Sequence, residues 1–89
     1  MLDIDDFKII NDTHGHAIGD KVLITISQEI SNHIRESDLF GRWGGEEFLI
    51  VIPDKDKTSL LHFAEKIRQI VENIIFEDCL KTTVSIGAT

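Results

Sequence analysis

Two neighbouring glutamates follow two glycines in the middle of the chain, in the run Gly44, Gly45, Glu46, Glu47, Phe48. Charges at the entry to an otherwise apolar strand cost stability unless a ligand or a cation compensates them. Glycines let the backbone approach a bulky ligand closely and offer N–H groups to it. Successive side chains of a strand point to opposite faces, so only one of the two glutamates should face a given site unless the turn distorts the pleat. A plain diglycine hairpin with solvated glutamates explains the pattern equally well.

A second group of carboxylates, Asp3, Asp5 and Asp6, surrounds the end of the first predicted strand. If that strand lies beside the hairpin, Asp3 can face a hairpin glutamate across the two strands. Two carboxylates so close repel each other unless a cation lies between them, and Mg²⁺ favours one or two carboxylates together with substrate phosphates. Two-metal sites use this arrangement to align a hydroxyl group with phosphorus. The alternative is a solvated acidic strand end.

The elements that must position these groups follow from the apolar pattern. It predicts strands over residues 1–5, 39–43, 48–52 and 82–86. It predicts a short helix over residues 6–11, a turn-rich stretch broken at Gly15, a longer helix that begins at Gly19 and Asp20 and runs to about residue 36, and a helix over residues 59–73. This order favours an α+β fold, with a ferredoxin-like, palm-type antiparallel sheet of the split βαβ kind and packed helices.

Composition limits the classes of partner. The 89 residues, 42% of them hydrophobic, are typical of one globular domain, and no apolar run approaches the length of a membrane span. Sixteen acidic against nine basic residues give a net charge of −7, which argues against DNA or RNA as a partner and suggests that bound phosphates need cations. A single cysteine, Cys79, excludes an internal disulfide and a cysteine-built zinc site.

Three blocks of residues resemble the GGDEF family of bacterial diguanylate cyclases, and together they cover essentially the whole chain. The first block contains Asp3, Ile4, Asp5, Phe7, Lys8, Asn11, Asp12, Gly15, His16, Gly19 and Asp20; the second is Gly44 to Phe48; the third is Val84 to Gly87. The resemblance implies a nucleotidyl-cyclase-like fold and an enzyme that condenses two GTP into cyclic di-GMP and two pyrophosphates, each GTP being held by one half of a homodimer. The alternative is a non-catalytic regulatory domain that binds GTP or cyclic di-GMP.

The resemblance also implies roles in the chemistry. Asp3, Glu46 and the backbone carbonyl of Ile4 would hold two Mg²⁺ or Mn²⁺ ions per active site, and Glu46 would also assist deprotonation of the 3′-hydroxyl. Lys8 would stabilise the transition state beside the phosphates, as a lysine point charge can. Glu47 would support the site.

The substrate pocket implied by the family involves further residues. Asn11 and Asp20 would read guanine through its hydrogen-bonding edge, and His16 would contribute to the pocket. Gly44 and Gly45 would let the hairpin pass beside the phosphates.

Each of these residues also has an ordinary structural explanation. Lys8 fits a solvated helix position, Asn11 fits the end of a helix near a turn, and Asp20 fits an N-cap. His14 and His16 form at most a weak metal pair, because they lie two residues apart without a third ligand.

Arg35 and Asp38 fall at the family's Arg-x-x-Asp position, five residues before the signature. The resemblance implies that they form the product-inhibition site, where arginine can pair with phosphate or guanine and aspartate can accept from guanine. Otherwise they form a helix end, with Arg35 compensating the helix dipole and Asp38 acting as a cap.

Relative to the family, residues 1–89 are expected to form a partial domain, truncated at both ends. The start of the first strand and a C-terminal helix and strands, including basic residues that contact the triphosphate, would lie outside it. The resemblance leaves open whether the 89 residues alone are active. It also implies a cytoplasmic location, with any tether to the inner membrane provided by other domains.

Overall fold

The computed structural model describes residues 1–53, 55–76 and 80–87, so Cys79 lies outside the described residues. Along the chain the elements are β1 (Leu2–Ile4), α1 (Phe7–His14), α2 (His16–Ser31), β2 (Leu39–Gly44), β3 (Glu47–Val51), α3 (Lys57–Glu72) and β4 (Val84–Ile86). The order of strands and helices is the predicted one.

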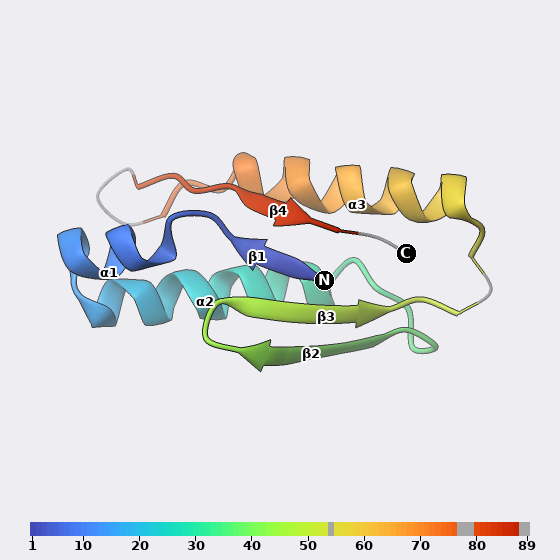
Figure 1. The fold of residues 1–89 in the computed structure, drawn as a ribbon, viewed down its shortest axis with the longest axis horizontal. Coiled ribbons are helices and arrows are strands. Elements are labelled where there is room, and N and C mark those ends of the chain that lie inside the picture. Colours follow the sequence, from blue (N-terminus) through green and yellow to red (C-terminus); the bar gives the residue numbers. More distant parts are fainter. Residues whose placement is uncertain (54, 77–79, 88–89) are drawn as a thin grey trace.

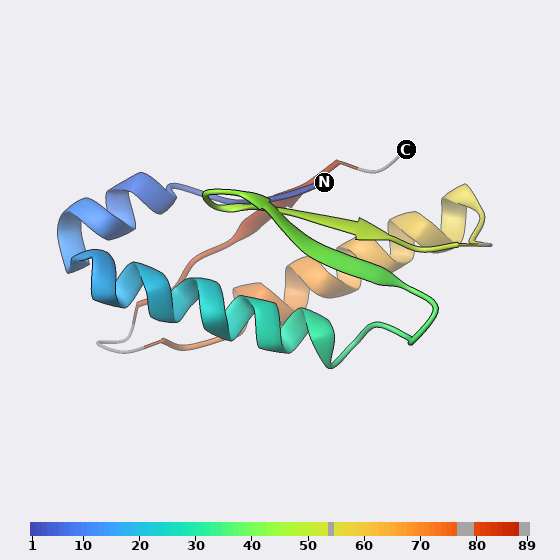
Figure 2. The same cartoon turned by 90° about the horizontal axis from the view of Figure 1, so that it is seen from below.

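The strands form one sheet in the order β2-β3-β1-β4, in which every neighbouring pair is antiparallel. Helices α2 and α3 run along one face of this sheet, and α1 lies at one end of it (Figure 1, Figure 2). This arrangement confirms the predicted α+β class with β1 beside the second strand of the hairpin. Within the described ranges no helix combines the length and the apolar character that a membrane span requires.

A single apolar core joins the helices to the central strands. The most completely buried side chains come from β1, β3, α2 and α3: Leu2, Val22, Ile26, Ile30, Phe48, Ile67 and Val71. Leu2 and Ile4 are both buried against this core, and alternation along the strand therefore directs Asp3 to the opposite face of the sheet.

The second helix differs from its predicted bounds at both ends. Helix α2 begins at His16, so most of the expected turn-rich stretch is helical and Gly15 alone separates α1 from α2. Gly15 can do this because its φ of 91° lies in a region that other residues rarely adopt. Asp20 is consequently inside the helix, and its interpretation as an N-cap is wrong.

At its other end, α2 stops at Ser31 rather than near residue 36. The side chain of Asp38 accepts a hydrogen bond from the backbone N–H of Arg35 at 2.8 Å, and the N–H of Asp38 donates to the carbonyl of Arg35 at 2.9 Å. Such local side-chain bonds compete with the helical pattern, so the chain turns toward β2.

Candidate functional site

A row of polar side chains crosses the face of the sheet that α2 and α3 leave uncovered. Asp3 pairs with Glu47 of β3 on one side and with Ser85 of β4 on the other. Residues directly opposite in antiparallel strands share a face, with Cβ atoms roughly 5 Å apart. The two carboxyl side chains are half-buried, and neither forms a hydrogen bond or ion pair with another described residue. Like charges are therefore placed side by side without a protein cation between them.

Glu46 lies in the turn between β2 and β3, at the end of β1. Gly45, the first residue of the turn, has a φ of 47°, and the pairing of the two strands shifts register between Arg42 and Gly44. The backbone N–H of Ile4 donates to the carbonyl of Glu46 at 3.2 Å. The register thus places Glu47 opposite Asp3 and holds Glu46 beside them through its backbone, a division that the sequence left open.

The other two aspartates of the first acidic group have different surroundings. The carboxylate of Asp5 accepts hydrogen bonds from the hydroxyl groups of Thr83 and Ser85, each at 2.7 Å. Asp6 precedes α1 with a φ of 55°, and its side chain makes no capping hydrogen bond. Asp5 is therefore fastened to the run into β4, whereas Asp3 is available to a ligand.

The donor set at the end of β1 suits a hard cation. Asp3 and Glu47 place two carboxylates side by side, with Glu46 in the adjoining turn, and a bound cation would relieve the repulsion between the adjacent carboxylates. Across the described ranges no three side chains of the His, Cys, Asp or Glu type converge on one point. His14 and His16, on either side of Gly15, therefore gain no third ligand from these ranges. Mg²⁺ readily binds at sites where two carboxylates supply part of its oxygen ligands and substrate phosphates supply others.

Helices α1 and α2 form a helical hairpin that brings Asn11 close to Asp20. A Cβ atom built on Gly19 would overlap the side-chain oxygen of Asn11, so this position can carry no side chain without displacing that amide. Asn11 is half-buried, and Asp20, the next residue after Gly19, is exposed. The role of Gly19 as the contact point of the two helices escaped the sequence analysis, although a glycine inside an apolar helical stripe is a signal for close packing.

Lys8 and His16 lie on the same pair of helices, and both are exposed. Both views place the turn between β2 and β3 at the end of the molecule where α1 lies and α2 begins (Figure 1, Figure 2). The turn that carries Glu46 thus lies toward the same end of the molecule as α1 and the start of α2, the helices that carry Lys8, Asn11, His16 and Asp20.

Arg35 and Asp38 occupy the connection from α2 to β2 and contact each other. The Asp38 side chain is 3% exposed, and the Arg35 side chain is 62% exposed, with 3.5 Å between the guanidinium Nη2 and Oδ1 of Asp38. The hydrogen bond from the backbone N–H of Arg35 is the main cause that lowers the pKa of Asp38. Asp38 therefore closes the turn, and the arginine remains accessible to an anion.

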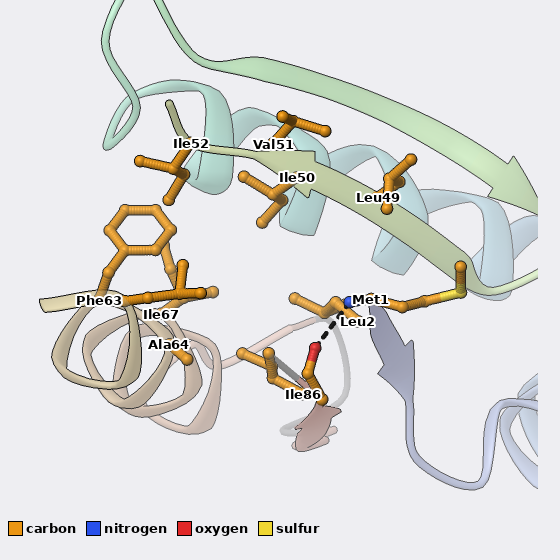
Figure 3. Close-up of a pocket in the computed structure, with 12 residues that line it drawn as sticks. Met1, Leu2, Leu49, Ile50, Val51, Ile52, Phe63, Ala64, Ile67 and Ile86 are labelled. Carbon is orange, nitrogen blue, oxygen red and sulfur yellow. Dashed lines mark hydrogen bonds between the residues drawn. The ribbon is translucent and has the colours of Figure 1, made fainter. Parts of the chain in front are cut away.

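A groove of about 280 Å³ lies away from all these residues, between β3 and α3 (Figure 3). Ile50 of β3 and Ile52, just beyond the end of that strand, face Phe63 and Ile67 of α3 across it, and Leu2 also lines it. No titratable side chain is among the residues that line it, in contrast to the acidic end of the sheet.

Comparison with known proteins identifies the family of this chain. The family model described as "Diguanylate cyclase, GGDEF domain" matches residues 1–89. The response regulator PleD of Caulobacter vibrioides is 42% identical over 94 residues, which cover all of this chain and 21% of that protein. The chain therefore spans about a fifth of the length of this curated relative.

Solved structures show the same fold. The active GGEEF domain of a diguanylate cyclase from Vibrio cholerae has a TM-score of 0.87 and 38% identity, over 93% of this chain and 54% of that one. The GGDEF domain of DgcB from Caulobacter crescentus, in complex with c-di-GMP, has a TM-score of 0.88 and 34% identity, over 94% of this chain and 53% of that one. Because sequence and fold agree along the whole of its length, this chain belongs to the GGDEF family, the domain family of the diguanylate cyclases.

Proposed function

We propose that this protein is a diguanylate cyclase that condenses two GTP into cyclic di-GMP and two pyrophosphates. The 3′-hydroxyl of each GTP attacks the α-phosphorus of the other, and pyrophosphate leaves. The observation that carries the proposal is the unneutralised carboxylate pair of Asp3 and Glu47 beside the glycine turn, in a chain of this family. The relative from Vibrio cholerae, with the same Glu-containing signature, is described as an active domain of a diguanylate cyclase.

The proposed reaction needs a divalent cation, Mg²⁺ or Mn²⁺, at two positions per site. Asp3, Glu46 and the carbonyl of Ile4 would hold it, and its charge would offset that of the phosphates. Glu46 accepts the proton of the 3′-hydroxyl. Glu47 supports the site with a second carboxylate opposite Asp3. Lys8 places a positive charge near the phosphate oxygens as negative charge develops on them.

The helical hairpin supplies the specificity for guanine in this proposal. Asp20 accepts from the ring and exocyclic N–H groups of guanine, and Asn11 pairs with its acceptor positions. His16 lines the pocket, and the absence of side chains at Gly44 and Gly45 leaves room for the phosphates. At the same two positions adenine has an unprotonated ring nitrogen and a C–H group, so Asp20 would find no N–H donor there.

The partners in this proposal are GTP, cyclic di-GMP and a second copy of the protein. Each copy holds one GTP, so the two reacting nucleotides meet only in a homodimer. Cyclic di-GMP acts as a feedback inhibitor by binding the accessible guanidinium of Arg35 next to Asp38. The bound relative DgcB shows that a domain of this family takes up c-di-GMP. The proposed location is the cytoplasm, where GTP is available.

The test is incubation of the intact protein with GTP and Mg²⁺, followed by chromatography for cyclic di-GMP and pyrophosphate. Glu46→Ala should abolish product, whereas Glu72→Ala, which removes a glutamate on the exposed side of α3, should not. Wild-type protein that forms no product but binds cyclic di-GMP, with binding lost in Arg35→Ala, would instead support the non-catalytic regulatory alternative.

A further inference from the structure

Arg42, an exposed residue of β2, forms a hydrogen bond with the turn that carries Glu46. Its Nε donates to the carbonyl oxygen of Gly45 at 2.8 Å. Gly45 has a positive φ. Glu46 has a negative φ: among the described residues other than glycine, Asp6 alone has a positive one. A positive φ at the first of two central residues, and a negative one at the second, is the pattern of a type II′ turn.

The peptide unit between Gly45 and Glu46 is the part of such a turn that can rotate. Its carbonyl does not join the pairing of the two strands, and reversing it converts a type II′ turn toward type I′. That change requires a positive φ at Glu46, which a residue with a side chain adopts only at a cost. A donor fixed on the carbonyl of Gly45 therefore opposes the rotation.

Two hydrogen bonds hold Glu46 from opposite sides. Arg42 holds the carbonyl that precedes it, and the N–H of Ile4 holds its own carbonyl at 3.2 Å. The contact from Ile4 joins two backbone groups, whereas the contact from Arg42 depends on one exposed side chain. The backbone on either side of the Glu46 side chain is thus held by two contacts, one of which Arg42 supplies.

We propose that Arg42 is a positioning residue, which fixes the peptide between Gly45 and Glu46 and thereby the backbone from which the Glu46 side chain projects. The inference rests on the proposed function, because it concerns how Glu46 is presented for that reaction. It assigns the effect to the hydrogen bond from Nε and not to the charge of the guanidinium.

Three substitutions at position 42 separate the hydrogen bond from the charge. Arg42→Gln keeps an N–H donor at the same distance from the backbone as Nε and removes the charge. Arg42→Met has the same length without a donor, and Arg42→Lys keeps the charge with its nitrogen one atom further out. Lys66→Met, on the exposed side of α3, is the control for loss of a surface cation.

The intact protein is assayed for kcat and for KM toward GTP, and the carbonyl ¹³C shift of Gly45 is measured by NMR without nucleotide. We expect Arg42→Met and Arg42→Lys to lower kcat roughly tenfold or more with little change in KM, because they lose the hydrogen bond to the carbonyl of Gly45. Arg42→Gln should restore most of kcat and the wild-type ¹³C shift.

Two results would overturn the inference. One is Arg42→Met with wild-type kcat and an unchanged Gly45 shift. The other is activity retained by Arg42→Lys and lost in Arg42→Gln, which would assign a direct charge effect on phosphate. If wild-type protein forms no product, the proposed function fails, and the Gly45 shifts of the Gln and Met variants still decide whether Arg42 fixes the turn.

Discussion

Asp3 and Asp5 lie two residues apart at the end of β1, yet they are held in different ways. Both oxygens of Asp5 accept hydroxyl hydrogen bonds, one from Thr83 and one from Ser85. Ser85 is also the register partner of Asp3, but its hydroxyl is directed to Asp5. Asp3 keeps Glu47 as its neighbour on the other side, a second carboxylate that can give it no hydrogen bond while both are ionised.

This difference separates a structural carboxylate from one that is free to bind a ligand. Hydrogen bonds compensate the charge of Asp5 within the fold, so Asp5 can stabilise the join between β1 and β4. The pair of Asp3 and Glu47 destabilises the fold unless a cation or a ligand neutralises it. Residues that lower stability where they lie, on an accessible face, are best explained by function.

The largest expected effect concerns catalysis. Asp3→Asn removes one charge with little change of shape and should lower the rate of cyclic di-GMP formation at least about a hundredfold, because it removes a proposed cation ligand. Asp5→Asn should lower it less than roughly tenfold at temperatures where the protein is folded, since a hydrogen-bonded amide can replace part of its contacts. Equal losses in the two variants would contradict the division between them.

A second prediction asks which glutamate acts with Asp3. We expect Glu46→Gln to weaken Mn²⁺ binding, measured by calorimetry, roughly tenfold or more, as loss of an oxygen ligand should. Glu47→Gln keeps the proposed ligands and should weaken it less. A larger effect of Glu47→Gln would mean that the strand register, which sets Glu47 opposite Asp3, also decides the ligand.

The third prediction compares the two aspartates in stability. Asp5→Ala leaves the hydroxyl groups of Thr83 and Ser85 without their acceptor and should lower the free energy of unfolding by about 1–3 kcal/mol. Asp3→Ala relieves repulsion with Glu47 and should raise it by about 0.5 kcal/mol without metal. Denaturant unfolding in the presence of a chelator measures both. A loss of stability in Asp3→Ala would show that Asp3 has a structural role as well.

The smallest expected effect concerns pH. Asp38 resembles Asp5 in having its carboxylate engaged, and the hydrogen bond from the N–H of Arg35 lowers its pKa. Its contribution to stability is therefore complete above the pKa of the unfolded chain, about 3.9, and is lost as the pH falls through the lower pKa of the folded state.

Asp38→Asn should accordingly make the fall of Tm below about pH 4 shallower than in the wild type. Thermal unfolding followed by circular dichroism at several acidic pH values is the measurement. A wild-type slope in Asp38→Asn would show that the contact with Arg35 contributes nothing to acid stability.

The sequence alone determined the family, the order of the elements and the face on which Asp3 lies. These features depend on local pattern: Leu2 and Ile4 are apolar on either side of Asp3, and strand alternation then directs Asp3 away from the core. The glycines and glutamates of the turn were equally visible in the sequence.

The tertiary structure alone decided which carboxylates meet. Glu47 lies opposite Asp3 because of the register in which β1 pairs with β3, and no local pattern sets the register of two strands so far apart in the sequence. Asp5 is fastened by residues 78 and 80 positions further along the chain. Helix α2 begins at His16 because one residue, Gly15, is enough to turn the chain between α1 and α2. Gly19 then packs against Asn11. Contacts between residues distant in sequence form only when the whole sheet and its helices pack together, and for that reason they had to be read from the fold.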